Sequence, residues 1–369
     1  MTITYALKSL PVIESAAQNK IHTVQSIRPG AYHDNLSQDG NLKSRAPEQS
    51  SSRPIWSRLP HRIDATILGH KRTKRVQQLG QIVTTVRRAV ASNDLREAER
   101  SFRRYRDSKG MSPESLEALS WLARGALAAH RFAKAAGYAR SVHRLAVRRL
   151  QNTELESDPH LSAALGASIE VLAQSKARRG HRSEAIRFLK RELDEYGSSS
   201  IGTRIRKNLN LLTMEGHAAP ELEIRDWLGL KPPALSELIG HPVLLFFWAH
   251  HCDDSRAQGQ VLARIREEFE SRGLVLIGPT RCYGSLDERG HKPILHRREM
   301  QHIQLVLRQH YSLLSGMPVS ISTRNFEVYG VSTTPTLVLV NRKGVVSYYH
   351  PGKLPYRELA SRIRKLLPK

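Results

Sequence analysis

Cysteine, aromatic residues and long apolar runs are all scarce in this chain of 369 residues. With two cysteines, a scaffold held together by disulfides is excluded, so each cysteine is either chemical or incidental. No apolar run approaches the roughly 18 residues that a membrane span needs, so we expect no membrane span. The length leaves room for two domains or one large one, with an ample core.

The first part of the chain lacks both periodicity and a targeting signal. Residues 1–72 are rich in Ser, Gln, Asn and Pro, and such a composition buries too little apolar surface to offset the entropy lost on ordering. At the N-terminus, Lys8, Pro11, Glu14 and Gln18 interrupt the apolar residues, so no signal peptide is recognisable. We predict a disordered, basic tail over residues 1–72.

Acidic residues are outnumbered, and the formal net charge is +24. The excess is greatest in residues 71–150, where 19 basic residues face 6 acidic ones. Such a surface can attract nucleic acid, acidic lipid or an acidic protein. Because no nucleic-acid motif accompanies the charge, we interpret it as a solvated, arginine-rich surface and do not expect a nucleic-acid partner.

Helical periodicity dominates residues 73–215. Ser112-Pro113 is a well-formed helix start, with Ser as the N-cap and Pro in the first turn. The helices predicted after this start span residues 116–129, 132–150, 160–178, 183–196 and 200–213. A break at Gly180 separates the members of the second pair. The pattern predicts an all-α domain of helical hairpins.

These hairpins resemble degenerate tetratricopeptide repeats. Trp121 and Phe132 match positions of the repeat pattern in the first pair. Small residues that let adjacent helices approach closely recur at Ala98, Ala135 and Ala185, at spacings that depart from the regular repeat of about 34 residues. Arrays of this type bind peptides or other proteins, so a protein partner for this domain is one expectation. The other is a helical domain that only packs against its neighbour.

After residue 215 the pattern changes to alternating strands and helices. Strands are predicted at 243–249, 274–278, 318–321, 336–340 and 345–349, and helices at 256–271, 291–314, 325–329 and 354–367. A mixed α/β sheet covered by helices accounts for this alternation. We therefore predict a multidomain chain, in which a helical domain at 73–215 precedes an α/β domain at 216–369.

Cys252 lies between a predicted buried strand and a predicted helix. The run Val243–Ala249 is apolar and strand-forming, and it ends abruptly in a polar turn that carries the cysteine. Unpaired N–H groups and the dipole at a helix N-terminus favour a thiolate. This placement makes Cys252 the main candidate for chemistry.

Two segments of the α/β region resemble the thioredoxin-like TlpA-type disulfide oxidoreductases. Phe247–Ser255 reads Phe-Trp-Ala-His-His-Cys-Asp-Asp-Ser, where the family has Phe-Trp-Ala-x-Trp-Cys-x-x-Cys. Gly330–Thr336 resembles the family's cis-proline segment. The resemblance covers roughly residues 216–369 and implies a thioredoxin-like α/β fold there.

The resemblance also implies thiol–disulfide exchange on protein thiols and disulfides, without a cofactor. Cys252 would be the nucleophile, His251 and the helix N-terminus would stabilise its thiolate, and Ser255 would hydrogen-bond it. The residues that would shape the substrate groove are Trp248, Thr334 and Pro335.

Two positions depart from the family pattern. Ser255 replaces the second cysteine and His251 replaces the tryptophan before the first. A single thiolate can attack a disulfide, but a serine cannot release the mixed disulfide that forms. Exchange would therefore proceed through one thiol or with an external resolving thiol. Asp253 and Asp254 add negative charge beside the thiolate and oppose the helix dipole.

Cys282 is a candidate for the missing resolving thiol. It follows the strand predicted at 274–278, which in the resembled fold lies beside the strand that leads to Cys252. A disulfide between the two cysteines requires Cα atoms within about 7 Å. The alternative is that Cys282 is incidental.

A peroxidase is a second reading of the site. Peroxiredoxins place a threonine three residues before the reactive cysteine, and this chain has Ala249 there.

A metal site is a third reading, because the residues of His250–Asp254 are all of ligating types. Adjacent residues rarely converge on one ion, and nothing in the sequence places His296, His302 or His310 beside them. We predict no metal site.

The remaining reading is a redox-inactive interaction or adaptor protein, in which a thioredoxin-like domain keeps its groove and the helical repeats bind a peptide. The resemblance implies work outside the cytoplasm, in the periplasm or another extracytoplasmic space, whereas the N-terminus shows no export signal.

Overall fold

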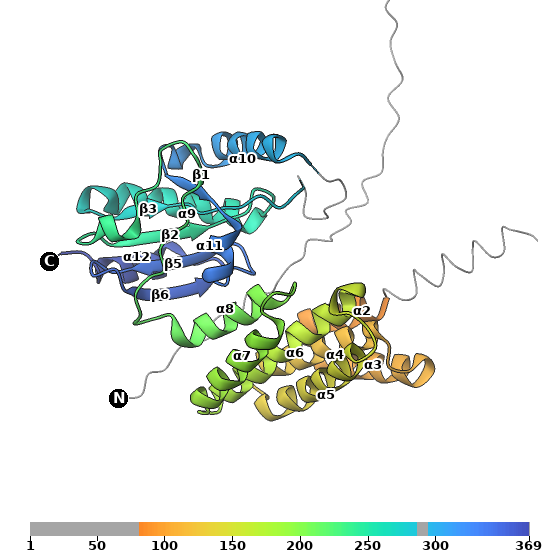
Figure 1. The fold of residues 1–369 in the computed structure, drawn as a ribbon. Coiled ribbons are helices and arrows are strands. Elements are labelled where there is room, and N and C mark those ends of the chain that lie inside the picture. The colour runs from red at the N-terminus through yellow and green to blue at the C-terminus, as the bar shows by residue number, and fades with distance from the viewer. Residues whose placement is uncertain (1–80, 286–293, 369) are drawn as a thin grey trace, which may run out of the picture. The chain divides into compact units, whose positions relative to one another are not determined.

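A computed structural model describes residues 81–285 and 294–368, so the tail predicted at 1–72 lies outside the described residues. Figure 1 shows a group of helices followed by a sheet with its own helices. The helices of the first group are α2 (Gln81–Ala91), α3 (Leu95–Lys109), α4 (Pro113–Ala128), α5 (Phe132–Leu150), α6 (Pro159–Arg178), α7 (Arg182–Tyr196) and α8 (Gly202–Thr213). None of the described helices is long and apolar enough to cross a membrane.

Local signals in the sequence start and stop several of these helices. The carboxylate of Asp94 accepts a hydrogen bond from the Glu97 N–H at 2.9 Å and caps α3. Ser112 caps α4 in the same way, with Pro113 in the first turn. Gly180, at φ 90°, makes the turn between α6 and α7. The predicted helical hairpins α4–α5 and α6–α7 are therefore present.

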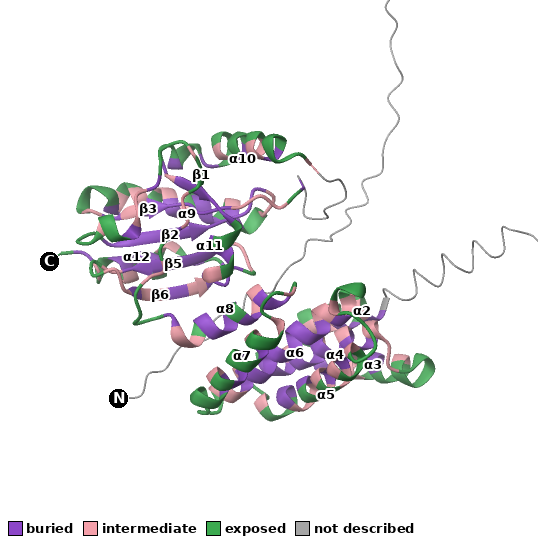
Figure 2. Cartoon of the chain, in the orientation of Figure 1, coloured by how far each residue is buried: buried purple, intermediate pink, exposed green. Residues whose placement is uncertain are grey.

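A continuous apolar core joins α2 to α8, from Ile82 to Leu209. The small residues Ala98, Ala135 and Ala185 are all fully buried, which allows their helices to approach closely. Figure 2 shows the buried residues on the inward sides of α4 and α6. The likeness of these hairpins to tetratricopeptide repeats, and with it the domain boundary at residue 215, stays a prediction.

The second group is built on a four-stranded sheet with the order β3-β2-β5-β6. Its strands are β2 (Val243–Phe247), β3 (Val275–Ile277), β5 (Thr336–Val340) and β6 (Val346–Pro351). β3 runs parallel to β2, whereas β5 runs antiparallel to both β2 and β6. A mixed sheet was predicted, and the register Val243↔Val340 fixes how its two halves meet.

All five residues of β2 are buried because apolar layers cover both faces of the sheet. Leu244 and Phe246 belong to the layer formed with α9 (Asp253–Phe269), α10 (His296–His310) and α12 (Tyr356–Arg364). Val243, Leu245 and Phe247 point to the other face, where α11 (Thr323–Val328) supplies Phe326. This alternation explains the unbroken apolar run in the sequence.

Two elements were not predicted as they stand. A short strand, β1 (Asp226–Leu228), pairs antiparallel with β4 (Val319–Ile321) although it has three residues and is largely exposed. The segment after α8, for which no strand or helix was predicted, contacts the sheet, because the N–H of Gly216 donates to the Val346 carbonyl at 2.8 Å. Ala219 N–H likewise donates to Gly344 at 2.8 Å, so this segment is tied to the β5–β6 hairpin.

Candidate functional site

Cys252 is the N-cap of α9, which starts at Asp253 and not at the predicted residue 256. Acidic residues in the first turn suit the positive end of the helix dipole, which explains the earlier start. The thiol is half-buried, and its Sγ donates a hydrogen bond to the Thr334 carbonyl oxygen at 3.3 Å. The structure therefore brings together Cys252 and Thr334, two residues that the family resemblance names for the site.

The sheet register explains this meeting. Phe247, the last residue of β2, pairs with Thr336, the first residue of β5. The residues that follow β2 and those that precede β5 therefore leave the sheet at the same edge. The peptide bond between Thr334 and Pro335 is cis. The Thr336 hydroxyl donates to the Thr333 carbonyl at 2.7 Å and holds this turn against β5.

Ser255 differs from its predicted role. Its side chain is fully buried on the inward side of α9, and its Oγ has no hydrogen-bond partner within the described structure. The recorded hydrogen bond of the Cys252 thiol goes to Thr334, so the predicted bond from Ser255 to the thiol is wrong for this state. The geometric reason is that the first turn of α9 points Ser255 into the core.

Trp248 also differs from its predicted role in the groove. The side chain is fully buried, its ring lies 4.9 Å from that of Tyr311, and its indole N–H donates to the Gly278 carbonyl at 3.0 Å. Because it continues the alternation of β2 into the core, it presents no surface to a substrate. Trp248 is a core residue that packs against Tyr311.

His251 lies beside Cys252 as predicted and makes part of an aromatic cluster. Its ring centroid is 4.7 Å from that of Tyr283 and 4.8 Å from that of His250, both edge to face. His250 is fully buried, and its Nε2 lies 3.1 Å from the Ser285 carbonyl oxygen. Burial lowers the pKa of His250, because an imidazolium would lose its hydration there.

The two acidic residues beside the thiol are paired with cations. Asp253 makes an ion pair with Arg256 at 2.9 Å, and Asp254 makes one with Lys353. Arg256 also donates to the His250 carbonyl at 3.0 Å, which ties the first turn of α9 to the preceding loop. The negative charge that the sequence places next to Cys252 is thus largely compensated.

Cys282, the predicted resolving thiol, is present as a free thiol, like Cys252. It is half-buried against the core on the α9 side of the sheet. Burial raises the pKa of Cys282 to about 11, with smaller contributions from the Glu299 and Asp226 carboxylates. A Cys252–Cys282 disulfide is absent from this structure and stays a prediction for the oxidised protein.

Sequence reasoning missed three residues of the site. Tyr283 packs on His251, Arg281 lies over the Tyr283 ring with Cζ 4.6 Å from its centroid, and Glu299 of α10 is buried beneath this loop. The Glu299 carboxylate accepts hydrogen bonds from the N–H groups of Tyr283 and Gly284. The available signal for the loop residues was the run Arg-Cys-Tyr at 281–283, which follows the strand predicted at 274–278 after two intervening residues.

Within residues 81–285 and 294–368, no group of three or more His, Cys, Asp or Glu side chains is arranged to hold a metal ion. His302 does approach His250, with ring centroids 5.3 Å apart, but the contact is edge to face. The metal reading of His250–Asp254 finds no support in the described part of the chain.

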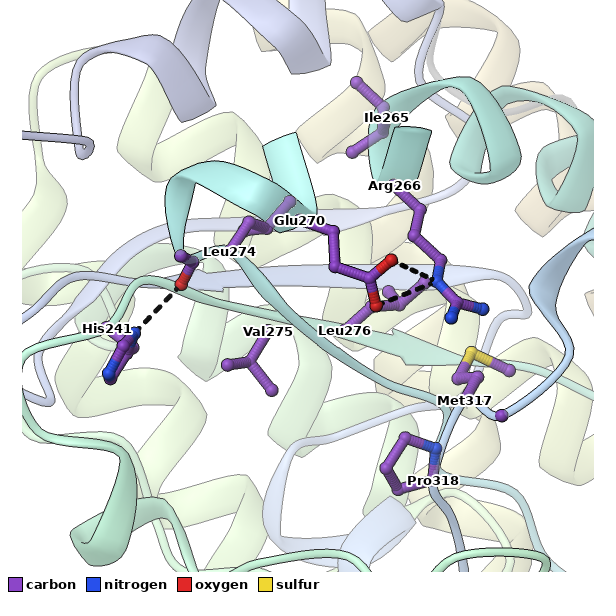
Figure 3. Close-up of a pocket in the computed structure, with 11 residues that line it drawn as sticks. His241, Ile265, Arg266, Glu270, Leu274, Val275, Leu276, Met317 and Pro318 are labelled. Carbon is purple, nitrogen blue, oxygen red and sulfur yellow. Dashed lines mark hydrogen bonds and ion pairs between the residues drawn. The ribbon is translucent and has the colours of Figure 1, made fainter. Parts of the chain in front are cut away.

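A cavity of about 380 Å³ lies elsewhere, beside β3 (Figure 3). It is lined by the Arg266–Glu270 ion pair, Met317 and Pro318. His241 lies at one end and is hydrogen-bonded to the Gly273 carbonyl. None of the predicted site residues lines it. The thiol site is therefore separate from this cavity.

Comparison with protein-family models finds no match, and comparison with curated proteins finds none either. Among solved structures, the chain is similar to a putative thiol:disulfide interchange protein DsbE from Chlorobium tepidum, at 21% identity and a TM-score of 0.33, over 41% of this chain and 96% of that one. It is similar to the exposed lipoprotein thioredoxin Etrx1 from Streptococcus pneumoniae, at 20% identity and a TM-score of 0.32, over 40% and 100%. A third is a secreted disulfide oxidoreductase of Mycobacterium tuberculosis, at 17% identity and a TM-score of 0.27, over 36% and 86%.

These solved structures are thioredoxin-like proteins, and the likeness is confined to about two fifths of the chain. Identities and TM-scores this low carry no conclusion about activity.

Proposed function

We propose that this chain is a thiol–disulfide oxidoreductase that acts through Cys252, in a thioredoxin-like domain at residues 216–369. The observation that supports this most is the hydrogen bond from the Cys252 Sγ to the Thr334 carbonyl oxygen at 3.3 Å. The half-buried Cys252 thiol, at the start of the 17-residue helix α9, therefore lies beside the backbone of Thr334, the residue that precedes Pro335. Such a thiol can meet an extended peptide that carries a disulfide.

The start of α9 directs backbone N–H groups toward Cys252. Cys252 has no side-chain cap on the helix, and the first bond of the helical ladder runs from the Arg256 N–H to the Cys252 carbonyl at 3.2 Å. The N–H groups of the first turn before Arg256 therefore remain directed toward the cysteine end. A helix N-terminus of this kind interacts favourably with a negatively charged group.

The chemical step then balances as a simple exchange. The Cys252 thiolate attacks one sulfur of the substrate disulfide, the new S–S bond forms as the old one breaks, and the leaving sulfur takes the electron pair as a thiolate. The Cys252 thiolate has lost its proton, so it no longer donates to the Thr334 carbonyl. That carbonyl then becomes free to accept a hydrogen bond from the substrate backbone, while Pro335 offers no N–H.

Release of the mixed disulfide needs a second thiol. Ser255 supplies none, and Cys282 is held mainly in its neutral form by its raised pKa. We therefore propose a monothiol mechanism, in which an external thiol resolves the adduct on Cys252. Protein thiols and disulfides are the proposed substrates.

The test is to trap the adduct. The full-length protein, Cys252→Ser and Cys282→Ser are incubated with a peptide that contains one disulfide, and intact mass reports the adduct. We expect the wild type and Cys282→Ser to gain one peptide each, whereas Cys252→Ser gains none at the same time point. An adduct that forms equally fast on Cys252→Ser would overturn the proposal.

A second candidate function is favoured by Ser255, a buried serine at the position where the resembled family has its resolving cysteine. In that reading the domain at 216–369 binds an extended peptide beside Thr334 without catalytic turnover. The helical domain at 73–215 binds a protein partner. Partner binding that is unchanged in Cys252→Ser, together with no adduct in the wild type, would support this adaptor.

A further inference from the structure

The side chains of Arg281 and Tyr283, which we call the wall, lie together beside His251, the residue next to the proposed nucleophile. The Tyr283 ring lies 4.7 Å from the ring of His251, the residue next to Cys252. The guanidinium of Arg281 lies over the Tyr283 ring at 4.6 Å and within 5.2 Å of the Phe326 ring centroid. Both side chains of the wall are half-buried. The contacts with the two rings hold the guanidinium beside them.

The charges around Cys252 leave this guanidinium without a carboxylate. Asp253 and Asp254 are paired with Arg256 and Lys353, and the buried Glu299 carboxylate accepts two backbone N–H groups. Among the described residues, no acidic side chain forms an ion pair with Arg281, and its Nε is buried without a hydrogen-bond partner. A buried guanidinium donor without a partner is costly unless a ligand satisfies it.

We propose that Arg281, positioned by Tyr283, selects disulfide substrates that carry a carboxylate next to the reacting sulfur. This inference rests on the proposed exchange at Cys252 and adds a substrate class to it. A carboxylate matches the fork of the guanidinium with two parallel hydrogen bonds, whereas a neutral or basic neighbour leaves the fork unpaired. Because the guanidinium is partly shielded from water, the pairing is stronger than on an open surface.

The loop that carries the wall is held in place independently of substrate. Glu299 binds the backbone of Tyr283 and Gly284 from below, and His250 lies next to the same loop with its Nε2 3.1 Å from the Ser285 carbonyl. The Tyr283 ring also contacts that of His250 at 5.7 Å. The guanidinium is therefore held in place beside Tyr283, which packs on His251 next to Cys252, and this lowers the entropy cost of recognising a substrate.

Two small disulfides that differ in charge test the inference directly. In a Cys282→Ser background, Cys252 reacts either with 5,5′-dithiobis(2-nitrobenzoate), which carries a carboxylate on each ring, or with the neutral 2,2′-dithiodipyridine. The released aryl thiolate or thione gives a second-order rate constant for each reagent. We expect Arg281→Gln to slow the carboxylated reagent about 5-fold to 10-fold and to leave the neutral one within about 2-fold. The wild-type preference should shrink when salt is raised to about 1 M, because charge pairing is screened.

Two further variants sharpen the comparison. Tyr283→Leu removes the ring that supports the guanidinium and should reduce the preference for the carboxylated reagent, whereas Tyr283→Phe should keep it. Arg272→Gln is the matched control, because Arg272 also lies over an aromatic ring, that of Phe269, but at the opposite end of α9. The neutral reagent reports on folding in every variant, since a misfolded site would change both rates together.

The outcomes separate the two proposals. If neither reagent modifies Cys252 faster than a free cysteine peptide, the proposed exchange function fails. If both reagents modify Cys252 but Arg281→Gln changes both rates equally, or neither, the exchange function stands and the selection of carboxylates by Arg281 is overturned.

Discussion

The thiol of Cys252 and the carbonyl oxygen of Thr334 lie 3.3 Å apart, although 82 residues separate them in the chain. The contact depends on two strands that run antiparallel, β2 and β5, and on the pairing of Phe247 with Thr336 at their shared edge. It also involves the same carbonyl that we propose for substrate binding. Loss of the Cys252 proton and release of the Thr334 carbonyl are thus one event.

Restoring a second cysteine should convert the site to an internal dithiol. Ser255→Cys places a thiol one helical turn after Cys252, and it sacrifices no hydrogen bond because the Ser255 hydroxyl has no partner in the described structure. We expect an intramolecular disulfide on mild oxidation and an increase of roughly tenfold or more in the steady-state rate of insulin reduction. Thiol counting gives three free thiols in the reduced variant and one after oxidation. Ser255→Ala is the control, and three free thiols after oxidation would count against the proposed geometry.

Cys282 should react only at high pH. Its folded-state pKa of about 11 lies above the ordinary value of 9.0, so its thiolate fraction rises roughly tenfold for each pH unit between pH 7 and pH 10. Alkylation of Cys282 by iodoacetamide in Cys252→Ser, followed by mass spectrometry, measures this rate. The folded state keeps this proton to a higher pH than the unfolded state does. The free energy of unfolding should therefore fall as pH rises from about 9 to about 11. A rate that already levels off at pH 9 would contradict the assignment.

His250 should make the fold sensitive to acid. Burial lowers its pKa below the ordinary 6.5, so below about pH 6.5 the unfolded chain binds a proton that the folded chain resists. Stability should therefore fall as pH is lowered from 7 to 5.5, and His250→Asn should show a smaller fall. Urea unfolding at the two pH values measures the difference. The exposed His181, changed to Asn, serves as the reference, and equal slopes for all three proteins would exclude this role.

Glu299 should be important for stability beyond what a surface carboxylate contributes. In Glu299→Gln one of the two N–H groups, of Tyr283 or Gly284, faces an amide NH₂ in place of an oxygen. We expect a loss of about 2 kcal/mol in the free energy of unfolding and faster amide exchange at both residues. Glu327→Gln is the matched control, because Glu327 is exposed and meets Arg324 at 3.6 Å. A change of a few tenths of a kcal/mol in both variants would show that the buried bonds matter little.

Local signals explain how much of the fold the sequence predicts. Asp94 and Ser112 start helices through hydrogen bonds to residues three positions away, so their effect is visible in a short window. The apolar run of β2 and the strand Thr336–Val340 were likewise found from their composition. β1, with three mostly exposed residues, gives no such pattern, and only its pairing with β4 makes it a strand.

The site was predicted less completely, because its parts meet only through tertiary structure. Cys252 and Thr334 could be named from their motifs, but the burial of Trp248 depends on which face of β2 it follows. Arg281 and Tyr283 carry no motif at all, and their relevance appears only when their loop is seen against His251. Spacing in a sequence gives the order of such residues but not the distances between their side chains.

The buried Glu299 has a wider consequence for the molecule. Its carboxylate belongs to α10, yet it fixes the backbone of the loop whose Tyr283 ring packs on His251, the residue next to Cys252. Any change that shifts α10 along its axis therefore displaces Tyr283 without touching the nucleophile. We therefore expect the position of α10 to affect how accessible the Cys252 thiol is. A substitution in α10 would then change the reactivity of the thiol from a distance.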